Sequence, residues 1–161
     1  MSIISNCTES VIKNAATSLI EGNLVAFPTE TVYGLGADAS DAKAVDRIYQ
    51  VKDRPKDHPL IVHVANMQAI EDWVEDVPDF AISLARAFWP GPMTLILKRS
   101  ALAEDFITGG QDTVGLRVPN HPIALALLHE FQKLGGKGIA APSANRFGHV
   151  SPTTAGAVQE E

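Results

Sequence analysis

Apolar positions recur along the chain with two alternating periods. Helical spacing predicts helices over 9–21, 41–51, 78–88 and about 122–134. Short continuous runs rich in Val, Ile and Leu predict strands at 24–28, 60–64, 93–97, 113–118 and 138–142. Because strands alternate with helices, the pattern predicts an α/β fold in which helices pack against a mixed sheet.

Some local signals refine this pattern. Thr8 is placed to cap the 9–21 helix and Gly22 to end it. In the 78–88 helix we expect four apolar residues to face the core: Phe80, Leu84, Ala85 and Phe88. The prolines at 90 and 92 predict a rigid turn into the strand at 93–97.

Length and composition restrict the class of protein. With 161 residues, 45% apolar and 20% charged, residues 1–161 fit one globular domain with a sizeable core. A net charge of −6 argues against binding nucleic acid through bulk electrostatics. No apolar run approaches the roughly 20 residues of a bilayer span, and no signal sequence begins the chain. These features predict a cytoplasmic protein with no membrane segment.

Polar residues at the ends of the predicted strands are the candidates for chemistry. Thr29 and Thr31 follow the strand at 24–28, where a hydroxyl can bind a ligand or, more commonly, cap a turn. Lys52, Arg54 and Lys56 alternate along a proline-bounded loop, which suits either a phosphate chain or a solvated turn.

Two ionisable residues lie inside apolar strand-like runs. The first is His63, and a lone histidine inside an apolar strand is more often a hydrogen-bonded core residue than a catalytic one. Arg117 requires an anionic partner if it is buried, either a substrate carboxylate or an internal Asp or Glu. After the last strand, the Ser143 hydroxyl and the Asn145 amide can donate to phosphate oxygens or cap a helix.

Common nucleotide and metal motifs are missing from the sequence. The glycines at 34 and 36 do not make a dinucleotide fingerprint, and no P-loop pattern occurs. Neither H-E-x-x-H nor a paired cysteine spacing is present, so we predict no protein metal site.

Six motifs, taken together and in order, resemble the YrdC-like family of L-threonylcarbamoyladenylate synthases over roughly residues 9–158. They are PTETVYGLG, the K-x-R of Lys52 and Arg54, HPLIVHV, WPGPMTLIL, TVGLRVP and PSANRFGHVSPTT. The resemblance implies a twisted, open α/β sheet with a concave active-site face. It also implies that L-threonine, bicarbonate and ATP, the last with Mg²⁺, give threonylcarbamoyl-AMP and pyrophosphate. The product would then pass to a tRNA-modifying transferase, without direct tRNA binding by this chain.

Site residues follow from the same resemblance, position by position. It assigns phosphate binding and catalysis to Lys52, Arg54, Ser143 and Asn145. Further ATP contacts fall on His58, Thr113 and Ser151, and threonine binding on Thr31, His63 and Arg117.

The resemblance also indicates a departure and leaves two other functions open. Members of the family normally continue beyond Glu161 through a segment that completes the substrate pocket, so we expect a single YrdC-like domain lacking its C-terminal part. An RNA-binding module is one alternative. A domain that makes a carbamoyl-adenylate from carbamoyl phosphate and ATP is the other, and dependence on threonine would separate it from the synthase.

Overall fold

All the strands that the structure describes belong to one mixed sheet. The structure is a computed structural model, and it describes residues 2–3, 8–145 and 151–160. The strands are β1 (Ser2–Ile3), β2 (Val25–Pro28), β3 (Tyr33–Asp38), β4 (Ile61–His63), β5 (Leu95–Lys98), β6 (Thr113–Arg117) and β7 (Ile139–Ala140). Their order across the seven-stranded sheet is β1-β2-β3-β7-β4-β6-β5.

Strand directions make the sheet mixed and open. β1 pairs with β2, and β4 with β6, in parallel; the other neighbouring pairs are antiparallel. The first and last strands in the order, β1 and β5, form its two edges. The prediction of an open mixed sheet with flanking helices is therefore confirmed.

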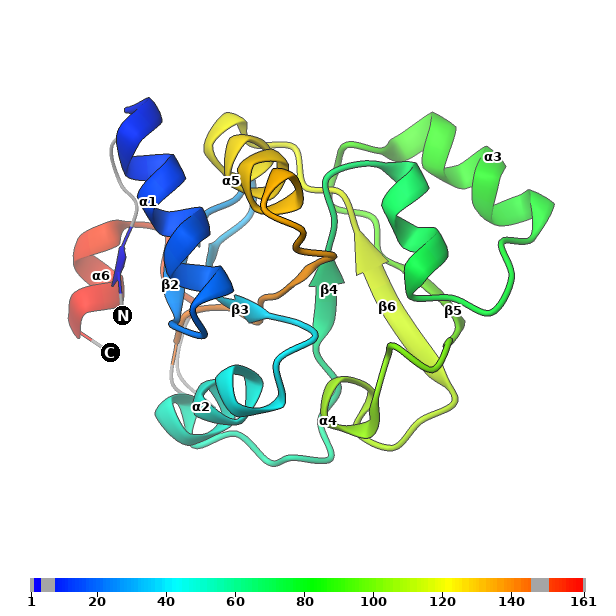
Figure 1. Cartoon of the computed structure of the whole chain (residues 1–161), viewed down its shortest axis with the longest axis horizontal. Helices are drawn as coiled ribbons and strands as arrows, with labels where there is room; N and C mark the ends of the chain where they lie inside the picture. Colours follow the sequence, from blue (N-terminus) through cyan, green and yellow to red (C-terminus); the bar gives the residue numbers. More distant parts are fainter. Residues whose placement is uncertain (1, 4–7, 146–150, 161) are drawn as a thin grey trace.

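Helices connect and flank these strands (Figure 1). They are α1 (Glu9–Ile20), α2 (Ala42–Lys52), the 3-10 helix η1 (Met67–Asp72), α3 (Asp79–Phe88), α4 (Asp105–Thr108), α5 (Pro122–Lys133) and α6 (Ala155–Glu160). The predicted cap of α1 is confirmed, because the Thr8 hydroxyl accepts the Val11 N–H at 3.3 Å. Asp41 caps α2 in the same way.

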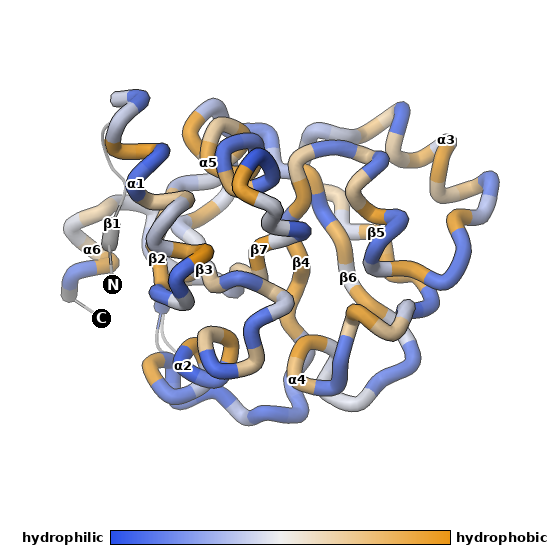
Figure 2. Tube along the Cα trace, in the orientation of Figure 1, coloured by the Kyte–Doolittle hydropathy of each residue, from blue (hydrophilic) through white to orange (hydrophobic). Residues whose placement is uncertain are grey.

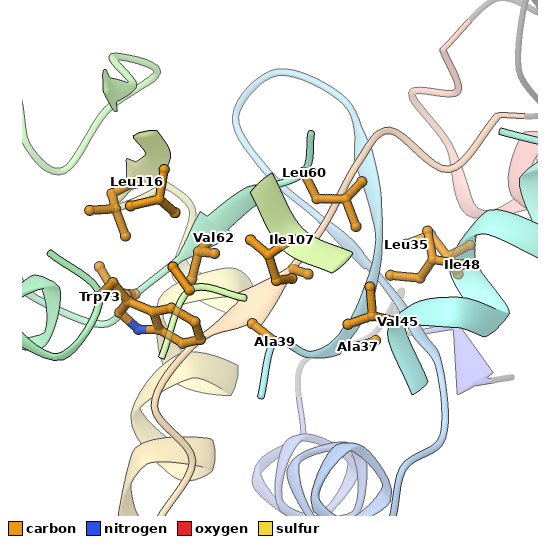
Figure 3. Close-up of a cluster of buried hydrophobic side chains, with 14 of the residues drawn as sticks. Leu35, Ala37, Ala39, Val45, Ile48, Leu60, Val62, Trp73, Ile107 and Leu116 are labelled. Atoms are coloured by element: carbon orange, nitrogen blue, oxygen red, sulfur yellow. The ribbon is translucent and has the colours of Figure 1, made fainter. Parts of the chain in front are cut away.

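Two apolar layers cover different parts of the sheet. On one face, α1 and α5 pack over Val25, Phe27 and Ile139. On the other face, α2 and α4 cover a larger cluster that runs across the sheet; Figure 3 shows side chains of strands β3, β4 and β6 gathered with those of α2 and with Trp73. In Figure 2 the central strands β7 and β4 are hydrophobic segments of the trace.

The half of the sheet formed by β4, β6 and β5 keeps one face open. Along β4, Val62 is fully buried, whereas the next residue toward the N-terminus, Ile61, is 37% exposed. Ile96 on β5 is 66% exposed. Since alternate strand residues point to opposite faces, the second face of these strands is accessible to a ligand.

The orientation predicted for α3 is wrong. Phe80, Leu84 and Phe88 are 58%, 36% and 57% exposed, and the buried residues of the helix are Ala81 and Ala85. The two small alanine side chains belong to the apolar core, and the large side chains lie on the outer face of the helix. Of the residues predicted to face inward, only Ala85 does so.

Several described elements were not predicted. β3 is the longest strand, although its sequence contains Gly34 and Gly36. A Cβ on Gly36 would lie 2.8 Å from side-chain atoms of both Phe27 and Ile139, so this strand needs glycine to pack against its neighbours. The short elements β1, η1 and α4 were also missed.

Candidate functional site

Five of the residues predicted for the site line one pocket of about 290 Å³. They come from the turn between β2 and β3, the loop after α2, the strands β4 and β6, and the segment after β7. The five are Thr31, Arg54, His63, Arg117 and Ser143. Glycine at 34 and the chain from Pro59 to Ile61 complete much of the wall.

His63 is held in the pocket as a neutral imidazole. It is 3% exposed and makes an edge-to-face contact with Phe27, at a ring distance of 6.3 Å. Burial, reinforced by the positive charge of Arg117, lowers the pKa of His63 to about 4. At neutral pH the ring therefore carries no charge and offers one nitrogen as an acceptor.

Arg117 has the anionic partner that its burial requires. Its Nη2 donates to Glu30 Oε1 in an ion pair, and its Nε donates to the Gly91 carbonyl at 3.1 Å. The second oxygen of Glu30 accepts the Asn120 N–H at 2.6 Å. The sequence left open whether Arg117 pairs with a substrate carboxylate or with an internal Asp or Glu. In the described structure its partner is an internal glutamate, Glu30.

The WPGP turn supplies part of this arrangement. The Trp89–Pro90 peptide bond is cis, and the Gly91 N–H donates to the Val118 carbonyl at 2.8 Å. A Cβ at Gly91 would lie 2.4 Å from the Phe88 carbonyl oxygen, so glycine is needed for this close turn. The turn thus brings the Gly91 carbonyl to the end of β6, where it meets Arg117.

Arg54 reaches the pocket from the loop that follows α2. Asp53 ends the helix in the left-handed region, at φ 54°, and the chain then turns toward β4. Arg54 Nη2 donates to the Pro59 carbonyl at 3.0 Å, and burial lowers the pKa of Arg54. The Tyr49 hydroxyl supports this loop by donating to the His58 carbonyl at 3.0 Å.

Two buried polar atoms in this pocket have no hydrogen-bond partner. They are Arg54 Nε and His63 Nδ1, and within the described part of the chain no other buried side-chain nitrogen or oxygen lacks a partner. Both residues line the same pocket. Because leaving a buried polar group unpaired costs about 1–3 kcal/mol, their convergence indicates a place where a polar ligand completes the bonding.

Behind the pocket, Lys52 holds the segment that carries Ser143 and Asn145. Lys52 is 2% exposed, and its Nζ donates to the carbonyl oxygens of Ser143, at 2.6 Å, and of Asn145. The Ser143 hydroxyl donates to Asn145 Oδ1, which the Ser151 hydroxyl also approaches at 3.4 Å. Lys52, Asn145 and Ser151 are therefore linked to one another and to Ser143 without lining the pocket themselves, and their predicted contacts to ATP remain predictions.

The two threonines after β2 differ in their bonding. The Thr29 hydroxyl accepts the N–H groups of Thr31 and Val32 at 3.3 and 3.2 Å and donates to the Val32 carbonyl at 2.6 Å. It thus stabilises the turn, as capping chemistry predicts. The Thr31 hydroxyl lies 3.0 Å from that of Thr29 and is exposed in the pocket wall.

Thr113 lines a second pocket on the open sheet face. This pocket, of about 250 Å³, shares Pro59, Leu60 and Ile61 with the first. Its remaining wall includes Thr94, Ile96 and Gly115. The two pockets therefore adjoin, and together they give room for a ligand with a polar end and a flatter, apolar end.

A larger cavity elsewhere contains none of the predicted residues. It measures about 630 Å³ and lies between the start of α2 and the segment 99–106. Arg99 there already donates to Asp105, Thr108 and the Ala103 carbonyl. We therefore assign the site to the smaller pocket, where buried polar groups still lack partners.

The described residues contain no cluster of three or more His, Cys, Asp or Glu side chains that could hold a metal ion. The acidic side chain that contacts the predicted threonine-binding residues is Glu30, and its two oxygens already accept hydrogen bonds.

Within the part of the chain that the structure describes, no helix is long and apolar enough to cross a membrane.

A family model covers most of the chain. The Sua5–YciO–YrdC model, described as telomere recombination, matches residues 17–161. The chain belongs to this family. The family membership predicted from the sequence motifs is thereby confirmed.

Members of the family include named enzymes. A threonylcarbamoyl-AMP synthase from Pyrococcus abyssi is 50% identical over 165 residues, which cover 100% of this chain and 47% of that protein. One from Bacillus subtilis is 51% identical over 146 residues, covering 89% and 41%. The chain thus spans about half the length of these curated relatives.

The solved structures of the family have the same fold. A crystal structure of P. abyssi Sua5 complexed with L-threonine matches with a TM-score of 0.92 and 48% identity. The match covers 100% of this chain and 46% of that one. The predicted YrdC-like fold is therefore confirmed for this chain.

Glu30 and Gly91 are the site residues that sequence reasoning missed. The need of Arg117 for an anion was a signal for Glu30, because that glutamate lies between the candidate residues Thr29 and Thr31. No comparable signal indicates Gly91, since it contributes only a backbone carbonyl.

Proposed function

We propose that this chain makes L-threonylcarbamoyl-AMP from L-threonine, bicarbonate and ATP and releases pyrophosphate. The observation that carries the proposal is the pocket in which Arg54 Nε and His63 Nδ1 both lack partners, beside Arg117. Further support comes from relatives with about 50% identity that are named threonylcarbamoyl-AMP synthases. The P. abyssi protein complexed with L-threonine is one of the related structures.

Threonine would bind at the end of the pocket formed by β4 and β6. The Arg117 guanidinium suits the carboxylate, because its Nη1 makes no hydrogen bond to the described residues and a charged donor binds an anionic oxygen strongly. His63, with a pKa of about 4, adds no second positive charge and can accept a hydrogen bond from the ammonium or hydroxyl group. The Thr31 hydroxyl is the third predicted contact at this end.

The reaction requires two bonds to form in sequence. Bicarbonate takes up a proton and loses water to give carbon dioxide. The neutral threonine amine attacks the carbon of carbon dioxide and releases a proton, which gives a carbamate. A carbamate oxygen then attacks the α-phosphorus of ATP. The bond from that phosphorus to the oxygen bridging to the β-phosphate breaks, and pyrophosphate leaves with the electron pair. The protein contributes mainly position and charge, because no side chain needs to form a covalent bond.

ATP would lie with its phosphates at Arg54 and Ser143. Arg54 is a partly buried cation whose buried Nε has no partner among the described residues, which suits a phosphate oxygen. Lys52, Asn145, His58 and Ser151 would act at or behind this end, and Thr113 in the adjoining pocket would contact the nucleoside part. Mg²⁺ would enter bound to the phosphates of ATP as part of the substrate, where it neutralises charge on the leaving pyrophosphate.

The test is pyrophosphate release with MgATP, L-threonine and bicarbonate, omitting each substrate in turn. We expect release only when all three are present. Release that depends on carbamoyl phosphate instead of threonine would replace this proposal with the carbamoyl-adenylate reaction. Affinity for RNA without any release would replace it with the binding module.

The proposal includes the fate of the product. A reactive threonylcarbamoyl-adenylate must be consumed by a transferase that moves the threonylcarbamoyl group to an acceptor, here an adenosine of tRNA. This chain would hand over the product without holding tRNA itself, which agrees with its net charge of −6. Such a reaction belongs in the cytoplasm, where ATP and tRNA are available.

A further inference from the structure

Glu30 occupies a position between two parts of the pocket wall that are far apart in sequence. It lies in the turn after β2, and both of its neighbours, Thr29 and Thr31, line the pocket. Its Oε1 accepts from Arg117 Nη2, and its Oε2 accepts from the Asn120 backbone N–H at 2.6 Å. Both oxygens of the carboxylate are therefore engaged by groups at the C-terminal end of β6.

The pair is mostly withdrawn from water. The Arg117 side chain is 10% exposed and that of Glu30 is 21% exposed. An ion pair with hydrogen bonds on both partners in such surroundings fixes its geometry much more strongly than a surface pair. By contrast, the pair of Lys98 and Glu75 has side chains that are 71% and 59% exposed.

Two contacts determine the plane of the Arg117 guanidinium. The Gly91 carbonyl holds Nε, and Glu30 holds Nη2. Within the described part of the chain, Nη1 makes no hydrogen bond, and the residue lines the pocket. A planar group held at two of its three nitrogens presents the third in a fixed direction.

We propose that Glu30 is a positioning residue for the anion-binding end of the pocket, holding Arg117 so that Nη1 faces the ligand carboxylate. This inference rests on the proposed function, because the carboxylate is that of threonine. Glu30 does not act as a base toward the threonine amine, since both of its oxygens already accept internal donors. Its effect on the substrate passes through Arg117.

The test compares Glu30→Gln and Glu30→Ala with wild type by calorimetric titration of L-threonine and, separately, of ATP. Glu75→Gln is the matched control, because Glu75 pairs with Lys98 at 3.0 Å on the surface, away from the pocket. We expect Glu30→Ala to raise the Kd for threonine by about tenfold or more, as misplacing a substrate-binding group does. Glu30→Gln should give a smaller rise, and the Kd for ATP should change less than about twofold.

A double-mutant cycle separates positioning from general stabilisation. If Glu30 acts through Arg117, Glu30→Gln should have no further effect on threonine binding in an Arg117→Lys background. Thermal unfolding of each variant checks the fold, and Glu30→Gln, which keeps the side-chain volume, carries the comparison if Glu30→Ala does not fold.

Three results would overturn the inference. Unchanged threonine affinity in both Glu30 variants would make the ion pair structural only. Tighter binding in Glu30→Gln would mean that Glu30 competes with the substrate for Arg117. If wild type itself binds no threonine, the proposed function fails and the inference fails with it. If wild type binds threonine normally and the Glu30 variants bind it equally well, only the inference is rejected.

Discussion

His63 is a buried ionisable residue whose environment changes its chemistry. Its ring is buried between Phe27 and the charge of Arg117, and its pKa is lowered to about 4. The sequence predicted a buried histidine in a strand, and the more common interpretation was a satisfied core residue. The structure buries the ring as that interpretation expects, but Nδ1 has no hydrogen-bond partner among the described residues.

This pKa makes the stability of the fold depend on pH. An unfolded histidine has a pKa near 6.5, so between about pH 6.5 and 4 the unfolded chain binds a proton that the folded chain does not. Stability contributed by neutral His63 is therefore complete above pH 6.5 and falls as the pH is lowered through this window. The loss reaches roughly 3 kcal/mol below pH 4.

The measurement is the free energy of unfolding against pH for wild type and His63→Asn. We expect the difference between the two curves to change between pH 6.5 and 4, with wild type losing more. His129→Asn, at an exposed position of α5, is the control and should follow wild type. Parallel curves for wild type and His63→Asn would show that His63 titrates normally.

Lys52 illustrates a role that sequence alone does not define. The sequence predicted contact with phosphates, and the structure has its ammonium on the carbonyls of Ser143 and Asn145. Lys52→Met keeps the apolar stem and leaves these two buried carbonyls without their donor. We expect a loss of stability of about 1–3 kcal/mol together with loss of pyrophosphate release.

Lys56→Met is the matched control, because Lys56 has an exposed side chain that pairs with Asp46 at 2.8 Å. It should change stability by no more than about 0.5 kcal/mol. A Lys52→Met protein of wild-type stability would contradict the buried donor role. Wild-type pyrophosphate release from that variant would contradict any role in the site.

At the scale of elements, the periodic pattern predicted where helices and strands lie better than which way they face. α3 has large apolar side chains at 80, 84 and 88, and helical periodicity places them on one face. The structure buries the neighbouring face, with Ala81 and Ala85. Apolar spacing alone does not distinguish these two faces, because Ala81 and Ala85 are also apolar and also four residues apart.

The exposed face of α3 can be tested by stability. Phe80→Gln and Phe88→Gln should each change the free energy of unfolding by no more than about 0.5 kcal/mol, because these side chains are mostly in water. Ala81→Leu, at a fully buried position, should destabilise by about 1–3 kcal/mol through overpacking. Chemical denaturation measures all three, and the reverse ranking would restore the orientation that the sequence predicted.

β3 was missed for a related reason. Glycines at 34 and 36 weaken a strand by propensity, and their presence favours a loop in a prediction from sequence. In the sheet, Gly36 is required because Phe27 and Ile139 occupy the space of its missing side chain. That requirement depends in part on Ile139, which is about 100 positions away in the chain, so no local pattern could reveal it.

At the scale of the whole molecule, the site lies where segments from both halves of the chain meet. Thr31, His63, Arg117 and Ser143 are spread over more than 110 residues, yet they line one pocket. The motifs predicted these residues individually. Their convergence depends on strand order, in which β7 inserts between β3 and β4, and spacing along the sequence does not encode that order.

The open face of β4, β6 and β5 extends the site beyond this pocket. The adjoining pocket with Thr113 and Ile96 provides the surface on which we propose the nucleoside part of ATP to lie. Threonine and ATP would thus meet along the shared wall from Pro59 to Ile61. In the proposed arrangement, the two reacting ends of the substrates would lie beside Arg54.

The most direct test of this account uses bicarbonate labelled with carbon-13. The chain is incubated with L-threonine, MgATP and the labelled bicarbonate, and the adenylate product is identified by mass spectrometry. We predict threonylcarbamoyl-AMP carrying the heavy carbon, formed at a rate that falls strongly in Arg117→Ala. An adenylate without the label, or no adenylate in the presence of all three substrates, would contradict the proposed reaction.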